Sequence, residues 1–170
     1  MCGLAGVLSE PRHGAVSFEV LRRMAAMLRH RGPDGYGLYR DDRIGLAHTR
    51  LSIVDLAGGA QPIHNEDRTV WVVFNGEIFN HVELRRELEA RGHRFYTRSD
   101  TEVIVHGFEE WGAAAWEHFN GQFAFALWDD RERRLWLVRD PLGILPLHYA
   151  RVDGRVVFAS EAKALFATGY

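Results

Sequence analysis

Residues 1–8 read MCGLAGVL, a short apolar run that begins directly after a cysteine. The run predicts a strand over residues 3–8. Cys2 is the single cysteine of the 170-residue sequence, so the chain cannot form an internal disulfide. A chain of this kind suits a reducing compartment, and we expect a cytoplasmic protein.

The position of Cys2 bears on its chemistry. A lone cysteine is most often a small buried side chain. Because the residue after Met1 is small, however, the initiator methionine can be removed, which would give Cys2 a free α-amine. Such an amine has a pKa of about 8, close to the value of about 8.5 for a free thiol. The amine can therefore take the thiol proton, as in other nucleophiles that are activated by an N-terminal amine. Position alone leaves both interpretations open.

Downstream of this run, helices and strands occur in blocks. Apolar residues at helical spacing predict helices over residues 18–28, 81–91 and 102–111. Apolar and β-branched runs predict strands over residues 45–54, 70–74, 122–128, 135–138 and 156–159. The block arrangement favours a layered α+β domain over a doubly wound parallel sheet.

The segments between these elements are rich in turn-forming residues. We expect loops over residues 30–37 and 57–62, and a turn at Asn75-Gly76 that stops the 70–74 strand. Ser99-Asp100-Thr101 supplies capping residues for the helix that follows.

Length and charge exclude several classes of protein. A chain of 170 residues is expected to form a single domain over residues 1–170. Lys and Arg number 21 against 23 Asp and Glu, so the net charge of −2 argues against a nucleic-acid partner. The longest apolar runs, residues 123–128 and 70–74, are far too short to span a bilayer. No secretory signal is visible, and we expect no membrane partner.

The sequence contains no recognisable metal or nucleotide motif. None of the nine histidines is paired with another at a separation of two or four residues, and one cysteine cannot build a thiolate site. The glycines of residues 32–37 are in the wrong order for a dinucleotide fingerprint, and a phosphate-binding GxxxxGK[ST] loop is missing. We therefore expect neither a metal nor a cofactor in this domain.

A series of motifs follows the first strand in order along the chain. They are CGLAG (2–6), RGPDG (31–35), HTRLSIVD (48–55), NGEIFN (75–80), SDTE (99–102), RDPLGILPL (139–147) and SEAKAL (160–165). Together they closely resemble the class II glutamine amidotransferase domain, an N-terminal-nucleophile hydrolase. The best match is the N-terminal half of glutamine-dependent asparagine synthetases. The resemblance implies a four-layer αββα sandwich of two mainly antiparallel sheets between helices.

The resemblance also implies a reaction, the hydrolysis of L-glutamine to L-glutamate and ammonia through a γ-glutamyl thioester on Cys2. The α-amine of Cys2 would act as base and then as acid. Asn75 and Gly76 match the oxyanion hole of the family, with the Asn side-chain amide and the Gly backbone N–H as donors. Loss of one such donor typically costs about 100- to 1,000-fold in rate.

Charged residues in the motifs match those that bind the amino-acid end of glutamine in the family. Arg50 corresponds to the arginine that pairs with the α-carboxylate, a role that suits its bidentate guanidinium. Glu77 and Asp100 correspond to the acceptors for the α-ammonium. The backbone of Ile53 and Val54 is a further candidate for the lining of the pocket.

Two loops and two substitutions complete the comparison with the family. Residues 31–35 and 57–62 resemble segments that pack beside and close over the glutamine site, with plain loop structure as the alternative. Pro141 and Leu145 depart from the family pattern, which usually has a charged or bulky residue after Arg-Asp and often Lys before Pro-Leu. We expect both substitutions to lie outside the pocket.

In the family, ammonia passes to an ATP-dependent synthetase domain that makes asparagine. The expected partners are thus L-glutamine and such a domain, C-terminal or separate, and ATP and Mg²⁺ are expected only there. The chain would then be the N-terminal part of a longer synthetase, with a free-standing subunit as the alternative. A homodimer is also compatible with the sequence.

Two other functions compete with the glutaminase. Some relatives, such as β-lactam-forming synthetases, keep the fold without the nucleophile, so a catalytically silent scaffold that packs against a synthetase partner is the alternative. The retained Cys2, Arg50 and Asn75 argue against it. A redox-sensing thiol at Cys2 is a third hypothesis, which nothing else in the sequence supports.

Overall fold

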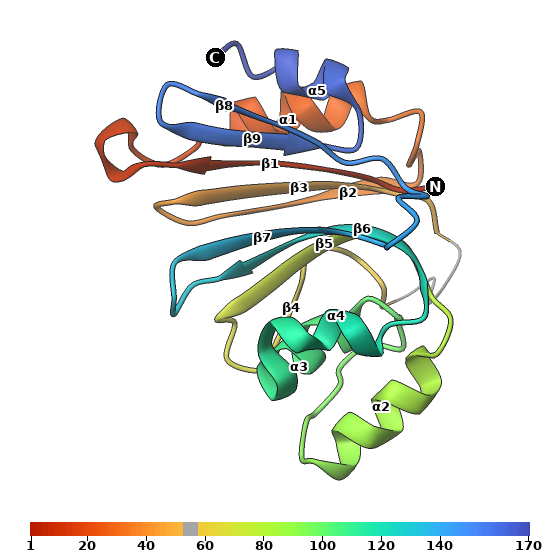
Figure 1. Ribbon diagram of the computed structural model, residues 1–170. Coiled ribbons are helices and arrows are strands. Elements are labelled where there is room, and N and C mark those ends of the chain that lie inside the picture. Colours follow the sequence, from red (N-terminus) through yellow and green to blue (C-terminus); the bar gives the residue numbers. More distant parts are fainter. Residues whose placement is uncertain (53–57) are drawn as a thin grey trace.

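Two antiparallel β-sheets face each other between two layers of helices in the computed structural model, which describes residues 1–52 and 58–170 (Figure 1). Sheet A has the spatial order β2 (Gly35–Arg40), β3 (Ile44–Arg50), β1 (Gly3–Ser9), β9 (Arg155–Ala159) and β8 (His148–Val152). Sheet B has the order β4 (Ile63–His64), β5 (Val70–Ile78), β6 (Gly121–Asp129) and β7 (Arg134–Arg139). All neighbouring strands in both sheets are antiparallel.

The helices cover the outer faces of the two sheets. Sheet A is covered by α1 (Phe18–Met27) and α5 (Ala162–Phe166) (Figure 1). Sheet B is covered by α2 (His81–Ala90), α3 (Glu102–Trp111) and α4 (Ala115–His118). Two short 3₁₀ helices, η1 (Pro11–His13) and η2 (Gly112–Ala114), complete the set within the described residues. The predicted αββα sandwich is confirmed.

The core consists of three apolar layers, and β1 shows how the sequence fills two of them. Leu4 points between the sheets, where it packs with Trp128 and Phe158. Ala5 and Val7 point the other way and pack against α1. Because successive side chains of a strand point to opposite faces, a strand covered on both faces must be apolar throughout. This is why residues 3–8 and 70–74 appear as continuous apolar runs.

The predicted helices agree closely with α1, α2 and α3, whereas two predictions for loops are wrong. Gly35, Tyr36 and Gly37 belong to β2, which pairs with β3 over its whole length. The 70–74 strand does not stop at Asn75-Gly76, because β6 pairs with β5 as far as Ile78. Backbone pairing with a neighbouring strand overrides the local turn preference in both places.

Besides the two 3₁₀ helices, four further elements among the described residues have no counterpart in the sequence predictions. They are β4, α4, β8 and α5, all of five residues or fewer. Elements this short carry no detectable apolar period. The predicted 45–54 strand ends earlier, at Arg50.

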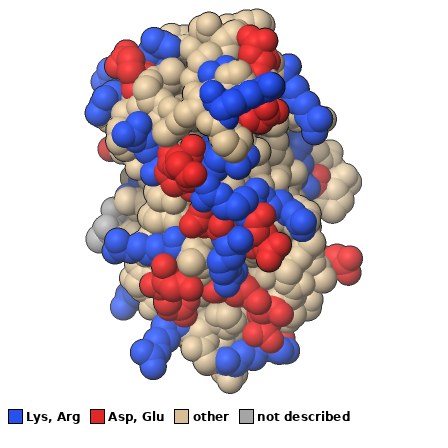
Figure 2. Space-filling model, turned by 90° about the vertical axis from the view of Figure 1, so that its left-hand side faces the viewer, with Lys and Arg blue, Asp and Glu red and all other residues tan. Residues whose placement is uncertain are grey.

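The surface is charged in a mixed fashion. Acidic and basic side chains intermingle over the face shown in Figure 2. In the part of the chain that the structure describes, no helix combines the length and the apolar character needed to cross a membrane.

Candidate active site

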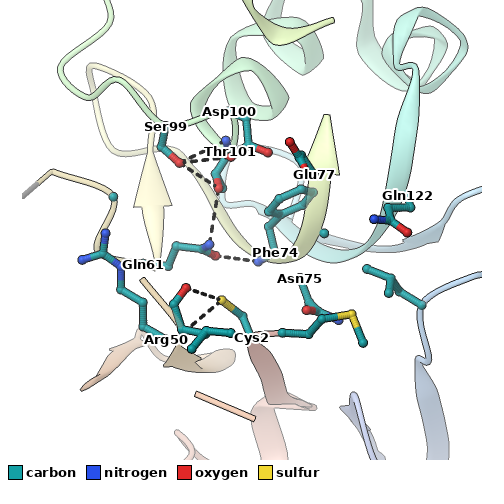
Figure 3. A pocket seen from close by; sticks show the side chains of 15 residues that line it. Cys2, Arg50, Gln61, Phe74, Asn75, Glu77, Ser99, Asp100, Thr101 and Gln122 are labelled. Carbon is teal, nitrogen blue, oxygen red and sulfur yellow. Dashed lines mark hydrogen bonds between the residues drawn. The ribbon is translucent and has the colours of Figure 1, made fainter. Parts of the chain in front are cut away.

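A cavity of about 150 Å³ lies where the start of β1, the end of β3 and the second half of β5 meet (Figure 3). The predicted site residues that line it are Cys2, Arg50, Asn75, Gly76, Glu77 and Asp100. Segments that are far apart in the sequence thus meet at one place. Ile53 and Val54 lie outside the described residues.

Cys2 stands immediately before β1, and its thiol is held by the chain that follows β3. The backbone N–H of Leu51 donates to Sγ over 3.3 Å, and Sγ lies 3.6 Å from the Leu51 carbonyl oxygen. Arg31 donates from Nε to the Cys2 carbonyl oxygen over 2.9 Å and pairs with Glu161 at 3.1 Å. Both the side chain and the backbone of Cys2 are therefore anchored.

Burial raises the pKa of the Cys2 thiol above its ordinary value. The hydrogen bond from Leu51, the positive N-terminus and Arg50 act in the opposite direction and do not overcome burial. Only the thiolate is an effective nucleophile. A nucleophilic role for Cys2 hence requires a base beside it.

Asn75 is 1% exposed, yet neither polar atom of its side chain has a hydrogen-bond partner among the described residues. Buried amides without partners are rare in folded proteins because each one loses its hydration without compensation. The Asn75 amide is next to the cavity that also holds the Cys2 thiol. Its Nδ2 is therefore a donor available to a ligand.

Gly76 follows on β5 with a backbone φ of 153°, a value that residues with a side chain rarely adopt. A Cβ at this position would lie 2.2 Å from the carbonyl oxygen of Gln122 and 2.7 Å from the Cα of Phe123. The pairing with β6 thus leaves room for glycine alone.

Two carboxylates, those of Asp100 and Glu77, lie on one side of the cavity (Figure 3). Asp100 is 5% exposed, and its Oδ2 accepts a hydrogen bond of 3.0 Å from the backbone N–H of Ile78. Burial raises the pKa of Asp100. A cation bound beside this carboxylate would offset that cost and favour its charged form.

The segment of residues 99–101 does not cap α3 as the sequence predicts. Thr101 is the N-cap residue, and its side chain makes no capping hydrogen bond. Its hydroxyl instead accepts from Gln61, and the Ser99 hydroxyl lies 3.1 Å from it. These side chains serve the cavity because α3 begins directly at its edge.

Arg50 is the last residue of β3 and lies across the cavity from Asp100 and Glu77 (Figure 3). The cavity therefore has a cationic side, contributed by sheet A, and an anionic side, contributed by sheet B and the segment before α3. This distribution of charge suits a zwitterionic ligand.

The loop of residues 31–35 packs against the end of β3, as the resemblance implies. The Asp34 carboxylate accepts from the backbone N–H of Ser52 over 2.7 Å, and the Asp34 N–H donates to the Arg50 carbonyl over 3.0 Å. A Cβ at Gly32 would lie 2.3 Å from the carbonyl carbon of Thr49. The loop thus supports both Arg50 and, through Arg31, Cys2.

Gln61 and Leu145 also line the cavity. Gln61 lies in the 57–62 loop that the resemblance places beside the glutamine site, although it was not predicted as a site residue. Gln61 accepts from the Phe74 N–H over 2.6 Å with Oε1 and donates to Thr101 with Nε2 over 3.3 Å, so it joins its loop to β5 (Figure 3). The expectation that Leu145 lies outside the pocket is wrong. The residues after β7 turn back under the cavity, and Leu145 is 2% exposed there. No local pattern signals the position of Leu145.

The part of the loop at residues 58–62 that the structure describes contributes Gly59 and Gln61 to the cavity. Ala57 lies outside the described residues, and closure of this loop over a ligand stays a prediction. Ser99, Thr101 and Gln122 complete the polar lining. Ser99 and Thr101 belong to the SDTE motif, so the motif did carry a signal for them.

Among the described residues, the His, Cys, Asp and Glu side chains that come close enough to share a metal ion are Glu66, His93, His106 and Glu109. None of the four lines this cavity.

Residues 1–169 match the family described as a glutamine amidotransferase domain. Asparagine synthetase [glutamine-hydrolyzing] 1 of Bacillus subtilis is 43% identical over 167 residues, which cover 97% of this chain and 26% of that protein. Asparagine synthetase [glutamine-hydrolyzing] 3 of Arabidopsis thaliana is 45% identical over 166 residues, which cover 97% of this chain and 28% of that protein. The chain thus spans about a quarter of the length of these relatives.

Solved structures show the same fold at low sequence identity. The glutamine phosphoribosylpyrophosphate amidotransferase from B. subtilis matches with a TM-score of 0.73 and 21% identity, over 99% of this chain and 44% of that one. An allosteric regulatory enzyme of purine biosynthesis matches with a TM-score of 0.80 and 22% identity, over 99% and 43% of the two chains.

Proposed function

The chain belongs to the glutamine amidotransferase domain family, and we propose that it hydrolyses L-glutamine to L-glutamate and ammonia with Cys2 as the nucleophile. One observation carries the proposal. The buried amide of Asn75, which has no partner among the described residues, lines the same cavity as the anchored thiol of Cys2. A nucleophile and an unused donor in one cavity are the two groups that acyl transfer requires.

In the first half of the proposed reaction, the Cys2 thiolate attacks the γ-carboxamide carbon and a C–S bond forms. The carbonyl oxygen becomes an oxyanion, which accepts hydrogen bonds from the Asn75 side chain and the Gly76 backbone N–H. The C–N bond then breaks, and the leaving nitrogen takes a proton and departs as ammonia. A γ-glutamyl thioester remains on Cys2.

In the second half, water attacks the thioester carbon and gives up a proton to the base. The C–S bond breaks, glutamate is released, and the sulfur regains a proton. The same oxyanion donors act in both halves because each half passes through a tetrahedral intermediate. The hydrolysis needs no metal, ATP or other cofactor.

We assign the base to the α-amine of Cys2, freed by removal of Met1. The amine takes the thiol proton, returns it to the leaving nitrogen, and later takes a proton from water. The raised pKa of the thiol supports a base on the same residue. Met1 lines the cavity, so its removal would also enlarge the space for glutamine.

The amino-acid end of glutamine would bind between the charged sides of the cavity. Arg50 would pair with the α-carboxylate, and Asp100 and Glu77 with the α-ammonium. The backbone of Ile53 and Val54 stays a candidate for further contacts. One cation facing two anions matches the charges of this ligand better than those of a simple amide.

We further propose that the ammonia serves a synthetase of the asparagine-forming kind, in which ATP and Mg²⁺ would be used. The proposal rests on relatives that are named as glutamine-hydrolysing asparagine synthetases and are about four times as long as this chain. The partner would be a domain of the same polypeptide or a separate subunit.

The test of the glutaminase is ammonia release by the parent and by Cys2→Ala, with intact mass to report whether Met1 is present. We expect activity only in molecules that lack Met1, and none above background in Cys2→Ala. Cys2→Ser should retain a trace, because a hydroxyl keeps the geometry but is a poorer nucleophile. Glutamine should add a γ-glutamyl group to the parent in acid-quenched samples.

Ammonia release by Cys2→Ala at the parent rate would refute the proposal. A parent with a free Cys2 terminus that neither releases ammonia nor forms the adduct would refute it as well, and would favour the scaffold. His148→Gln, at an exposed position on β8, serves as a control that should keep full activity.

A further inference from the structure

Four side chains converge at the other end of sheet B, away from the candidate active site. Glu66 lies in the turn between β4 and β5, His93 follows α2, and His106 and Glu109 are on α3. One ligand atom from each lies within 4.8 Å of those of the other three. The β4 end of the sheet and α3 lie side by side, which brings these segments together (Figure 1).

Two of the converging atoms are buried without a hydrogen-bond partner in the described part of the chain. They are Nδ1 of His106 and Oε2 of Glu109, which lie 3.5 Å apart. His106 is 0% exposed, so bulk solvent does not reach its Nδ1. An unpaired buried nitrogen that faces a carboxylate oxygen is costly, and a cation between the two would satisfy both.

The other polar atom of each histidine is held by a carboxylate. Nε2 of His106 lies 3.3 Å from Oε1 of Glu102, and Nε2 of His93 lies 3.3 Å from Oε2 of Glu110. A ring nitrogen that donates to a carboxylate leaves the opposite nitrogen free as a ligand. This pairing is the usual support for histidines that bind metal.

The two glutamates are oriented in the same way. Oε1 of Glu66 accepts from the backbone N–H of Arg94 over 2.8 Å, and Oε1 of Glu109 accepts from Nδ2 of Asn65 over 2.7 Å. Each of the four residues therefore uses one polar atom for the scaffold and directs the other toward a common centre.

We propose that Glu66, His93, His106 and Glu109 bind a divalent transition metal, with Zn²⁺ as the best fit. Two imidazole nitrogens and two carboxylate oxygens suit Zn²⁺ in four-coordinate geometry, and the two carboxylates balance its charge. Ligand atoms at tetrahedral Zn²⁺ lie about 3.4 Å apart. Nδ1 of His106 lies 3.5 Å from Oε2 of Glu109 and 3.6 Å from Oε2 of Glu66, and Nδ1 of His93 lies 3.9 Å from Oε2 of Glu109. Small rotations of these side chains would bring the four ligand atoms to the distances of a tetrahedral site.

A site in which the protein supplies every ligand is structural rather than catalytic. The metal would tie the β4–β5 turn and the segment after α2 to α3. Asp100 and Thr101 directly precede α3, so the metal would steady the helix whose first end carries part of the glutamine cavity. The inference does not depend on the proposed glutaminase reaction.

A proton is the competing occupant of the cluster. Burial lowers the pKa of His106, but the hydrogen bond to Glu102 and the nearby carboxylates of Glu109 and Glu66 outweigh it and raise the pKa to about 9. A protonated His106 would form an ion-paired cluster that needs no metal. Direct titration with metal distinguishes the protonated cluster from the metal site.

The test is calorimetric titration of Zn²⁺ into chelator-treated protein that carries Cys2→Ser, a change that removes the only thiol. We expect one equivalent to bind. Glu66→Gln and His93→Gln should each weaken binding at least tenfold, whereas His148→Gln should bind as the parent does. Co²⁺ in place of Zn²⁺ should give the visible absorption of a tetrahedral site, and should lose it in both ligand variants.

The Glu66 side chain is 41% exposed, so Glu66→Gln keeps the measurement possible even if changes at the buried His106 impair folding. A lack of stoichiometric binding in the Cys2→Ser protein would overturn the proposal and leave the protonated cluster. Equal Zn²⁺ affinity in the parent, Glu66→Gln and His93→Gln would overturn it too, since the ion would then be bound elsewhere.

Discussion

The two sheets make unlike contributions to the candidate active site. Sheet A supplies the guanidinium of Arg50 at the end of β3, and the residue directly before β1 supplies the thiol of Cys2. Sheet B supplies the amide of Asn75 and the backbone N–H of Gly76, and the segment directly before α3 supplies the carboxylate of Asp100. Neither sheet holds a complete set of groups for acyl transfer. The chemistry depends on how the sheets are fixed to each other.

Two kinds of contact hold the sheets in place. Leu4 and Phe158 of sheet A pack with Val73 and Trp128 of sheet B in the apolar layer between them. Near the cavity, Nε2 of His48 on β3 donates to the carbonyl oxygen of Phe74 on β5 over 3.1 Å. Substitutions in the part of the cavity that each sheet forms, or at this contact between the sheets, test the separate contributions of the two sheets.

The largest effect is expected on the side of sheet B, at Asn75. Asn75→Ala removes an oxyanion donor, so we expect kcat to fall about 100- to 1,000-fold while KM changes little. Steady-state ammonia release gives both constants, and thermal unfolding reports whether the fold persists. A folded Asn75→Ala protein with kcat within threefold of the parent would contradict the assignment.

A smaller effect on activity is expected when the charged residues on the two sides of the cavity are replaced. Arg50→Lys keeps the charge but loses the bidentate guanidinium, and Asp100→Asn removes the acceptor for the ammonium. Because a hydrogen bond to a charged group contributes about 1.5–3 kcal/mol, we expect kcat/KM to fall roughly 10- to 100-fold in each variant, chiefly through KM.

A glutamine analogue that lacks the α-amino group distinguishes the role of Arg50 from that of Asp100. Parent and Asp100→Asn should hydrolyse this analogue at similar rates, because the ammonium is gone. Arg50→Lys should still be impaired, because the carboxylate remains. The opposite pattern would reverse the roles of the two residues.

The smallest effect is expected at His48, which makes the contact between the sheets, and it concerns the free energy of unfolding. Burial lowers the pKa of His48 to about 3, against the hydrogen bond to Phe74, which raises it. The unfolded chain binds a proton at His48 near pH 6.5 and the folded chain does not, so the free energy of unfolding falls as the pH drops from about 6.5 toward 3. From pH 7 to pH 5 this residue should cost about 2 kcal/mol of stability.

Urea unfolding of the parent and His48→Gln at pH 7 and pH 5 measures this cost. Gln retains a donor but does not titrate, so the variant should lose less stability on acidification than the parent. His148→Gln is the control and should follow the parent. Equal acid sensitivity in the parent and His48→Gln would show that His48 takes up its proton in both states.

Local patterns in the sequence were enough for much of the fold. Helices α1, α2 and α3 were predicted because an apolar stripe at helical spacing is a property of ten adjacent residues. The two wrong predictions, of a turn at Asn75-Gly76 and of a loop at residues 35–37, also have a common cause. The end of β5 and the whole of β2 depend on strands that are distant in sequence, β6 and β3, and a strand edge that finds a partner overrides turn preference.

The candidate site shows the same limit. Motif resemblance identified Cys2, Arg50, Asn75, Gly76, Glu77 and Asp100, which the structure brings to one cavity. For Gln61 only its loop was predicted to lie beside the site, and Leu145 was misplaced, because the contacts of both side chains form only after the sheets have packed. The proposed metal ligands Glu66, His93, His106 and Glu109 were not predicted, because they come from three separate segments and only His106 and Glu109 are close in sequence.

The sequence by itself determined the class of the fold and the order of the long elements, and it singled out Cys2 as the candidate nucleophile. These follow from short-range periodicity and from motifs in which adjacent residues act together. The tertiary structure alone decided that the Asn75 amide is left without a partner beside the thiol, and that two histidines and two glutamates share a centre at the far end of sheet B. Such facts depend on which distant side chains come within a few ångströms, and the packing of the two sheets and their helices decides that.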